Sequence, residues 1–174
     1  KKMNLKDCYN FNDFRKLAKK KLPSPIFHYI EGGADDEITL NRNTEAFNDC
    51  DLVPSVLNSV GEPDLSATVF GTKISMPLFL SPTAMQSLYH PDGDKASARA
   101  AEKYGTIYSM STMASFSIEE VSSISSGPKI FQLYIHKDQS ITDDLIDRCK
   151  ATNFNGMCIT VDTIVAGNRE RDHR

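Results

Sequence analysis

The stretch KIFQLYI (129–135) has the composition of a buried strand that two polar residues interrupt. Side chains on a strand point alternately to opposite faces, so Gln132 and Tyr134 share one face. Similar apolar runs recur before and after this stretch. They predict further strands at PLFLS (77–81), TIYSM (106–110) and GMCITVD (156–162).

Helical patterns alternate with these strands. We expect helices over residues 95–105, 117–124 and 140–151. The second begins with the capping box Ser117…Glu120, and the third with the looser box Ser140…Asp143. Strands that alternate with helices predict successive βα units around a parallel sheet.

The residues before these units are predicted to be helical. The expected helices cover 11–21, a short stretch that Ser24-Pro25 opens and Gly32-Gly33 stops, and 35–48. A short extended piece at 65–71 follows. We therefore expect a helical N-terminal segment over 1–63 and a run of βα units over 64–174.

Two architectures accommodate a run of βα units: a doubly wound open sheet and a (β/α)₈ barrel. The open sheet usually has a glycine-rich first turn, whereas the first turn here is SPTAMQSLYHPDGD (81–94), with no G-x-G-x-x-G and no P-loop. This favours the barrel, although four units alone do not decide it. A barrel needs eight units and about 250 residues, and four strands alone would leave two open edges. We therefore expect the N-terminal half of a barrel, whose second half lies outside this sequence or on a separate chain.

Polar residues gather where the predicted strands end. In chain order they are Ser81 to Ala84, Ser111, Gln132, Tyr134, Thr160 and Asp162. In a barrel these ends meet at the mouth, where the chemistry takes place. Neutral groups of mixed donor and acceptor character suit a planar heterocycle with amide-like edges better than a metal. The alternative is an internal hydrogen-bond network or ordered water.

Composition excludes several classes of function. The net charge of −3 gives no general case for nucleic acid as a partner. No apolar run is long enough to cross a membrane, and the first residues lack the apolar core of a signal peptide. The four cysteines have neither zinc-site nor redox-pair spacing, so we expect no metal and a reducing compartment. The expected location is cytoplasmic, either free or peripheral at a membrane.

Motifs along nearly the whole chain resemble the FMN-dependent L-2-hydroxy-acid oxidase and dehydrogenase family, which includes glycolate oxidase, L-lactate dehydrogenase and mandelate dehydrogenase. The motifs are YIEGGADDEITLNRN (29–43), SMPLFLSPTAMQ (75–86), HPDGD (90–94), MSTMASFSIEEV (110–121), FQLYIHKD (131–138) and TVDTIVAGNRERD (160–172). The resemblance implies the N-terminal half of an FMN-binding barrel. It also implies oxidation of a lactate-, glycolate- or mandelate-like L-2-hydroxy acid to the 2-oxo acid.

The resemblance assigns a role to each matching residue. Those that lie against the flavin ring or bond its polar edges are Pro82, Thr83, Ala84, Ser111, Gln132 and Thr160. Those that bind the 2-hydroxy acid are Tyr29, Tyr134 and Arg169, and Tyr134 is also the catalytic residue that steadies the developing oxo group. The histidine base belongs to the family's second half, and none of the four histidines here takes its place.

The resemblance also implies partners. We expect a homo-oligomer, a tetramer by resemblance, with oxygen, a quinone or a cytochrome as electron acceptor. The motif GNRERD (167–172) is closer to the mandelate and bacterial lactate dehydrogenases, which favours a quinone or cytochrome. Two alternatives remain: a non-catalytic half-barrel that acts as a flavin-binding or assembly partner, and another phosphate-handling barrel enzyme.

Overall fold

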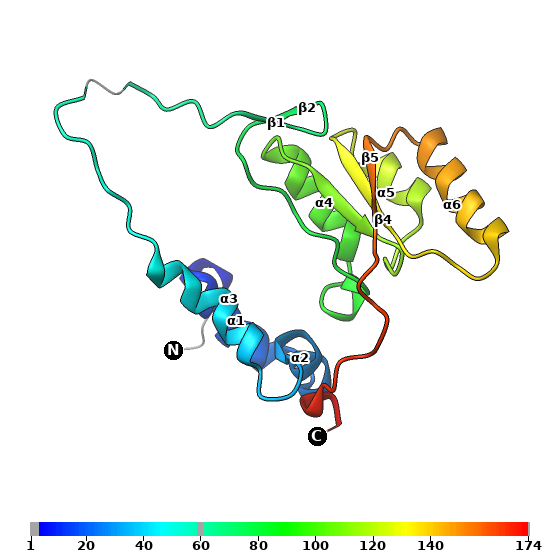
Figure 1. Ribbon diagram of the computed structural model, residues 1–174, viewed down its shortest axis with the longest axis horizontal. Coiled ribbons are helices and arrows are strands. Elements are labelled where there is room, and N and C mark those ends of the chain that lie inside the picture. Colours follow the sequence, from blue (N-terminus) through cyan, green and yellow to red (C-terminus); the bar gives the residue numbers. More distant parts are fainter. Residues whose placement is uncertain (1–3, 59–60, 174) are drawn as a thin grey trace. The chain divides into compact units, whose positions relative to one another are not determined.

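The computed structural model describes residues 4–58 and 61–173. The chain separates into two units, which we treat one at a time (Figure 1). The sheet unit comprises residues 60–164, and the N-terminal unit comprises residues 1–59 together with 165–174.

Three parallel strands form the centre of the sheet unit: β3 (Tyr108–Ser111), β4 (Lys129–Leu133) and β5 (Gly156–Ile159). They lie in the order β3-β4-β5, with Ser111 opposite Gln132 and Gln132 opposite Cys158. The three expected strands are therefore confirmed, although β4 and β5 end two or three residues earlier than predicted.

The strand expected over 77–81 is wrong in its extent. Only Leu80 pairs there, as an isolated parallel bridge to Tyr108. Its amide donates to the Ile107 carbonyl at 3.1 Å, and its carbonyl accepts from the Ser109 amide at 3.1 Å. Pro77 and Pro82 flank this stretch, and because proline has no amide proton the ladder cannot continue past them.

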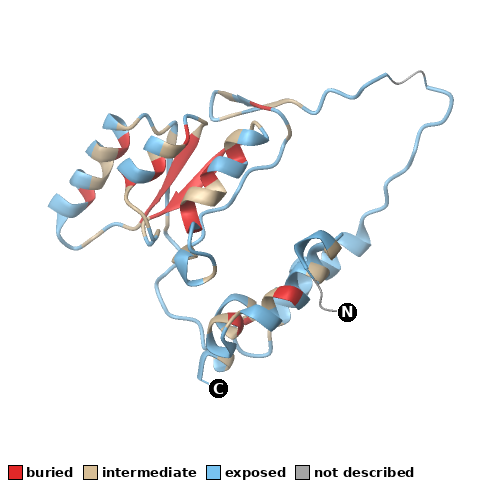
Figure 2. Cartoon of the chain, turned by 180° about the vertical axis from the view of Figure 1, so that it is seen from behind, coloured by how far each residue is buried: buried red, intermediate tan, exposed pale blue. Residues whose placement is uncertain are grey.

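Three helices pack on one face of this sheet: α4 (Gly93–Lys103), α5 (Ile118–Ile124) and α6 (Gln139–Ala151). The core that joins them to the strands consists of Ala98, Ala101, Tyr108, Met110, Ile118, Val121, Phe131, Leu133 and Cys149 (Figure 2). Strands that follow one another in chain order, with every helix on one face, form a barrel wall, whereas a doubly wound sheet reverses its order and carries helices on both faces.

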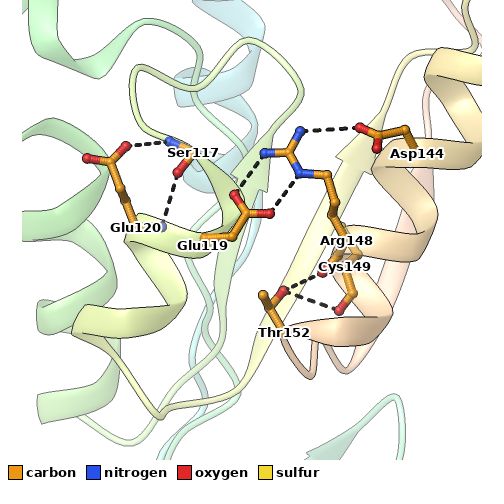
Figure 3. Close-up of polar contacts among 7 residues, drawn as sticks. All are labelled: Ser117, Glu119, Glu120, Asp144, Arg148, Cys149 and Thr152. Carbon is orange, nitrogen blue, oxygen red and sulfur yellow. Dashed lines mark hydrogen bonds and ion pairs between the residues drawn. The ribbon is translucent and has the colours of Figure 1, made fainter.

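Of the two predicted capping boxes, one is found in the structure and the other is not. Ser117 and Glu120 form the predicted capping box at α5, with reciprocal bonds of 3.1 and 3.0 Å. The box predicted at Ser140 is wrong, because the Asp138 carboxylate accepts the Ser140 amide at 3.0 Å and caps α6 instead. On the outer surface Arg148 of α6 makes a two-bond ion pair with Glu119 of α5 at 2.7 and 2.8 Å (Figure 3).

A hairpin precedes the sheet: β1 (Ala67–Val69) pairs antiparallel with β2 (Thr72–Ile74). Phe70 and Gly71 have φ angles of 51° and 72°, which a two-residue turn of this kind requires. Ile74 packs with Ile107 and Ile130. The hairpin therefore covers apolar side chains at the amino-terminal end of the sheet.

The N-terminal unit contains α1 (Phe11–Lys21), α2 (Ser24–Glu31) and α3 (Ile38–Glu45), with short 3₁₀ turns at η1 (Leu5–Asp7), η2 (Ala46–Asp49) and η4 (Glu170–His173). The first two helices match the prediction. The helix expected over 35–48 starts later, because Asp35 and Glu37 have left-handed φ angles of 48° and 58° that a right-handed helix cannot include. Among the helices of the described ranges, none has the length and apolar character to cross a membrane.

Candidate active site

A polar cluster lies at the carboxyl ends of the three strands. We call Ser111, Gln132 and Thr160 the strand-end cluster. The Ser111 hydroxyl donates to Gln132 Oε1 at 3.0 Å, and Gln132 Nε2 donates to Thr160 Oγ1 at 2.7 Å. Ser111 and Gln132 are buried, while Thr160 is half-buried. The structure therefore brings together the three residues that were expected to bond the polar edges of a flavin.

The internal bonds of the strand-end cluster fix which of its atoms can reach a ligand. Ser111 Oγ donates to Gln132 and accepts from the Met113 amide at 3.0 Å, so its proton is committed. Gln132 Nε2 has a second proton, and the Thr160 hydroxyl, which accepts from Gln132, still has its own. Both groups can therefore still donate a hydrogen bond, which suits the carbonyl oxygens and ring nitrogens of a heterocycle rather than a cation.

The loop after Leu80 carries the second expected flavin contact. Within the part of the chain that the structure describes, the Thr83 and Ala84 amides donate to no backbone carbonyl. The Thr83 carbonyl accepts from Gln86 Nε2 at 3.3 Å. Pro82 precedes these residues and restricts the backbone. Two adjacent amides without an internal acceptor are available to a bound group, as the resemblance requires.

Tyr134 is the first residue after β4. Its amide donates to Thr112 Oγ1 at 3.1 Å, and Thr112 Oγ1 donates in turn to the Gln132 carbonyl at 2.6 Å. These bonds fix the Tyr134 backbone beside the strand-end cluster. The Tyr134 hydroxyl bonds to no other residue in the ranges 4–58 and 61–173, so it is free to donate to a substrate.

Sequence reasoning missed that a carboxylate in the first turn of α4 is buried. Asp94 is completely buried and accepts from the Tyr108 hydroxyl at 2.8 Å and from the Ser115 amide at 2.9 Å. Burial, followed by the Asp94 charge, raises the pKa of Tyr108. Gln86 donates to the same hydroxyl at 3.4 Å. Asp94 thus connects the loop that carries Thr83 to the loop after β3, and Tyr108, a polar aromatic residue in an apolar strand, was the available signal.

The other two expected substrate residues meet in the N-terminal unit. The Arg169 guanidinium lies 5.1 Å from the centre of the Tyr29 ring and donates to the Tyr29 carbonyl. Its Nε also donates to Asp172 at 2.8 Å. Nε and Nη2 each make one bond, so both Nη1 protons and the second Nη2 proton remain available to a substrate carboxylate. Tyr29 itself is partly exposed at the end of α2.

No cluster of three or more histidine, cysteine, aspartate or glutamate side chains that could hold a metal occurs in residues 4–58 and 61–173. His90 Nδ1 accepts from the Asp92 amide at 3.1 Å, so the HPDGD motif forms a turn. His28 Nδ1 and His136 Nε2 are buried without a hydrogen-bond partner. None of these three imidazoles is bonded to the strand-end cluster or to Tyr134.

Comparison with known proteins agrees with this geometry. The FMN-dependent dehydrogenase family model matches residues 18–174. Glycolate oxidase 1 of Oryza sativa subsp. indica is 45% identical over 163 residues, which are 94% of this chain and 44% of that protein. Glycolate oxidase of Spinacia oleracea is 42% identical over the same share of each chain.

A crystal structure of a soluble mutant of the membrane-associated (S)-mandelate dehydrogenase from Pseudomonas putida superposes with a TM-score of 0.90 at 38% identity. The match covers 98% of this chain and 48% of that one. The chain thus spans about half the length of the relatives it matches, and the expected half of a (β/α)₈ barrel is confirmed. By its motifs, its fold and its matched residues, this chain belongs to the FMN-dependent dehydrogenase family.

Proposed function

We propose that the complete protein oxidises an L-2-hydroxy acid to the 2-oxo acid with FMN as its cofactor. The observation that carries this proposal is the strand-end cluster, in which Gln132 and Thr160 keep free donor protons at the mouth of a parallel βα wall. Membership of the FMN-dependent dehydrogenase family supports it.

The residues present fit the polar edge of a flavin. Gln132 Nε2 and the Thr160 hydroxyl would bond its acceptor atoms, while Ser111 orients Gln132. The amides of Thr83 and Ala84, with Pro82 before them, would lie against the ring. When bound, FMN supplies a two-electron acceptor.

The substrate is held by other residues of the chain. Tyr134 donates its free hydroxyl to the oxygen that becomes the oxo group, where charge develops in the transition state. Tyr29 and Arg169 Nη1 bind the carboxylate, to which a guanidinium offers charge-assisted bonds. The proton of the substrate hydroxyl goes to a base, which the family resemblance assigns to a histidine beyond the matched half.

A purified sample of the complete protein tests the proposal. We expect a yellow protein with one FMN per chain, whose flavin absorbance bleaches under anaerobic conditions with L-lactate, glycolate or L-mandelate but not with D-lactate. A colourless preparation that no hydroxy acid affects would refute the function. A yellow preparation that does not bleach would indicate the flavin-binding partner instead.

The electron acceptor and location belong to the same proposal. We propose a homo-oligomeric assembly and a cytoplasmic location, either free or peripheral at a membrane. The acceptor is oxygen, a quinone or a cytochrome, and the GNRERD motif (167–172) favours a quinone or cytochrome. The relative from Pseudomonas putida is described as membrane-associated, which supports the peripheral position. We also propose the division of the sequence into a helical segment (1–63) and a barrel half (64–174), whose last residues, 165–174, pack with the helical segment. Comparing oxygen uptake with quinone-analogue reduction during turnover separates the two kinds of acceptor.

A further inference from the structure

The segment that carries Arg169 is bonded to the loop between α2 and α3, about 130 residues earlier in the chain. The Asp35 amide donates to the Asn168 carbonyl at 2.9 Å, and Asn168 Nδ2 donates back to Asp35 Oδ1 at 3.0 Å. Arg171 Nη2 pairs with Glu37 Oε2 at 2.5 Å. We call these contacts, Asp35–Asn168 and Glu37–Arg171, the latch.

The Glu37 carboxylate bonds to both of the segments that the latch joins. Its Oε1 accepts the Gly33 amide at 3.0 Å, which closes the loop, while its Oε2 binds Arg171. The Glu37 side chain is 14% exposed and that of Arg171 is 41% exposed, so water is excluded from the carboxylate and only in part from the guanidinium. A charge-assisted bond in such a site is stronger than one in solvent.

The latch also holds a backbone that is unfavourable by itself. Asp35 and Glu37 both have left-handed φ angles, which side chains other than glycine rarely adopt. Such conformations persist only where the surroundings determine them, and they occur frequently at functional sites. The fit is also close, because a Cβ added to Gly32 would lie 3.3 Å from Arg171 Cβ. The loop conformation therefore depends on the segment docked onto it.

We propose that Glu37 and Arg171 are positioning residues for the substrate site, because their ion pair fixes Arg169 and Tyr29 relative to each other. Arg169 lies two residues from Arg171, and Tyr29 lies at the end of α2, just before the loop that Glu37 closes. This inference rests on the proposed function, in which Tyr29 and Arg169 bind the 2-hydroxy acid.

Variants of the ion pair in the complete protein test the proposal. Arg171→Met removes the pair, Arg171→Lys keeps a cation within reach of the carboxylate, and Glu37→Gln keeps an acceptor for Gly33 while removing the charge. We expect Arg171→Met and Glu37→Gln to raise KM for the hydroxy acid about tenfold, with kcat changed less than about threefold. Arg171→Lys should restore most of the loss, and FMN content should not change.

Arg148→Met is the matched control. It removes an ion pair of similar length on the outer helices of the sheet unit, and it should leave KM unchanged. Hydrogen exchange of the 29–37 amides gives a second reading that needs no turnover. Arg171→Met should increase their exchange at least about tenfold, and Arg148→Met should not.

The results separate the latch from the proposed function. If the wild-type protein oxidises no hydroxy acid, the proposed function fails, and unchanged exchange in Arg171→Met would overturn the latch as well. If exchange increases but KM stays at the wild-type value, the latch has no positioning role and the proposal is overturned. A rise in KM equal to that of Arg148→Met would overturn it too, because any loss of stability would then suffice.

Discussion

Replacing Gln132 with methionine tests the strand-end cluster most directly. Methionine has a similar length and no amide, so the variant removes the acceptor and the donor of residue 132 with little change in volume. Gln132 is 5% exposed and lies on the central strand β4, so water cannot easily replace its bonds.

The expected loss in the free energy of unfolding follows from the hydrogen bonds that this replacement removes. Ser111 is 4% exposed, and its hydroxyl loses its acceptor. The Thr112 amide keeps a bond of 2.9 Å to the carbonyl of residue 132, and half-buried Thr160 can bond water instead. One buried donor is thus left unpaired, which costs roughly 1–3 kcal/mol, so we expect a loss of about 2 kcal/mol in the free energy of unfolding.

Urea unfolding followed by far-ultraviolet circular dichroism measures this loss in the complete protein without FMN. Gln139→Met is the control, because Gln139 is exposed and bonds only Asp143, so its cost should stay below about 0.5 kcal/mol. FMN titration of the same variants should show weaker binding for Gln132→Met alone. Equal stability of the two variants would refute the buried network, and unchanged FMN affinity in Gln132→Met would refute its role in flavin binding.

Three further predictions concern single side chains. Tyr134→Phe should lower kcat by about 10²–10³ with FMN content unchanged, measured by steady-state kinetics, because one donor to the developing charge is lost. The Arg148 guanidinium lowers the pKa of Glu119 to about 2. The ionised Glu119 therefore stabilises the fold above its ordinary pKa near 4.5, and this contribution is lost as the pH falls toward 2. Glu119→Gln should reduce the change in unfolding free energy over this pH range, measured by urea unfolding, by less than about 1 kcal/mol, because both side chains are partly exposed. Burial raises the pKa of the Cys149 thiol to about 11, so at pH 8 an aromatic disulfide reagent should modify exposed Cys50 first and Cys149 only in denaturant.

Each of these predictions has a result that contradicts it. Wild-type turnover by Tyr134→Phe would remove that hydroxyl from the chemistry. An acid unfolding curve for Glu119→Gln that parallels the wild-type curve would mean that the pair with Arg148 does not persist in solution. Rapid labelling of Cys149 in the native protein would show that the helix α6 opens locally.

Local patterns predicted the parts of the fold that depend on neighbouring residues. The strand at 129–133 and the box at Ser117 each depend on residues within a few positions of one another, and both are found in the structure. The stretch 77–81 was misjudged because its apolar content outweighed Pro77 and the adjacent Pro82, which prevent pairing on either side of Leu80. Composition predicts burial, whereas pairing needs free amides.

Contacts across long sequence separations could not be predicted in this way. Glu37 and Arg171 are 134 residues apart, and nothing in their local sequences indicates a pair. The left-handed backbone at Glu37 lies in the loop that makes these contacts, and no local signal predicted it, so the start of α3 was misplaced. Asp94 is buried and accepts a bond from Tyr108, 14 residues later in the chain, and this contact has no local signal either.

The sequence suggested two alternatives for the polar residues at the strand ends, an internal hydrogen-bond network or a ligand site. The bonds of the strand-end cluster are compatible with both at once. The bonds among Ser111, Gln132 and Thr160 use one amide proton and one hydroxyl proton, and they leave another of each kind free. Because Gln132 is held at both ends, its remaining proton has a fixed direction before any ligand binds. Fixed dipoles cost no reorganisation when charge develops, which is the condition for electrostatic catalysis. In the proposed function the network and the flavin site are therefore the same structure, because the internal bonds of the cluster orient the protons that would bond the flavin.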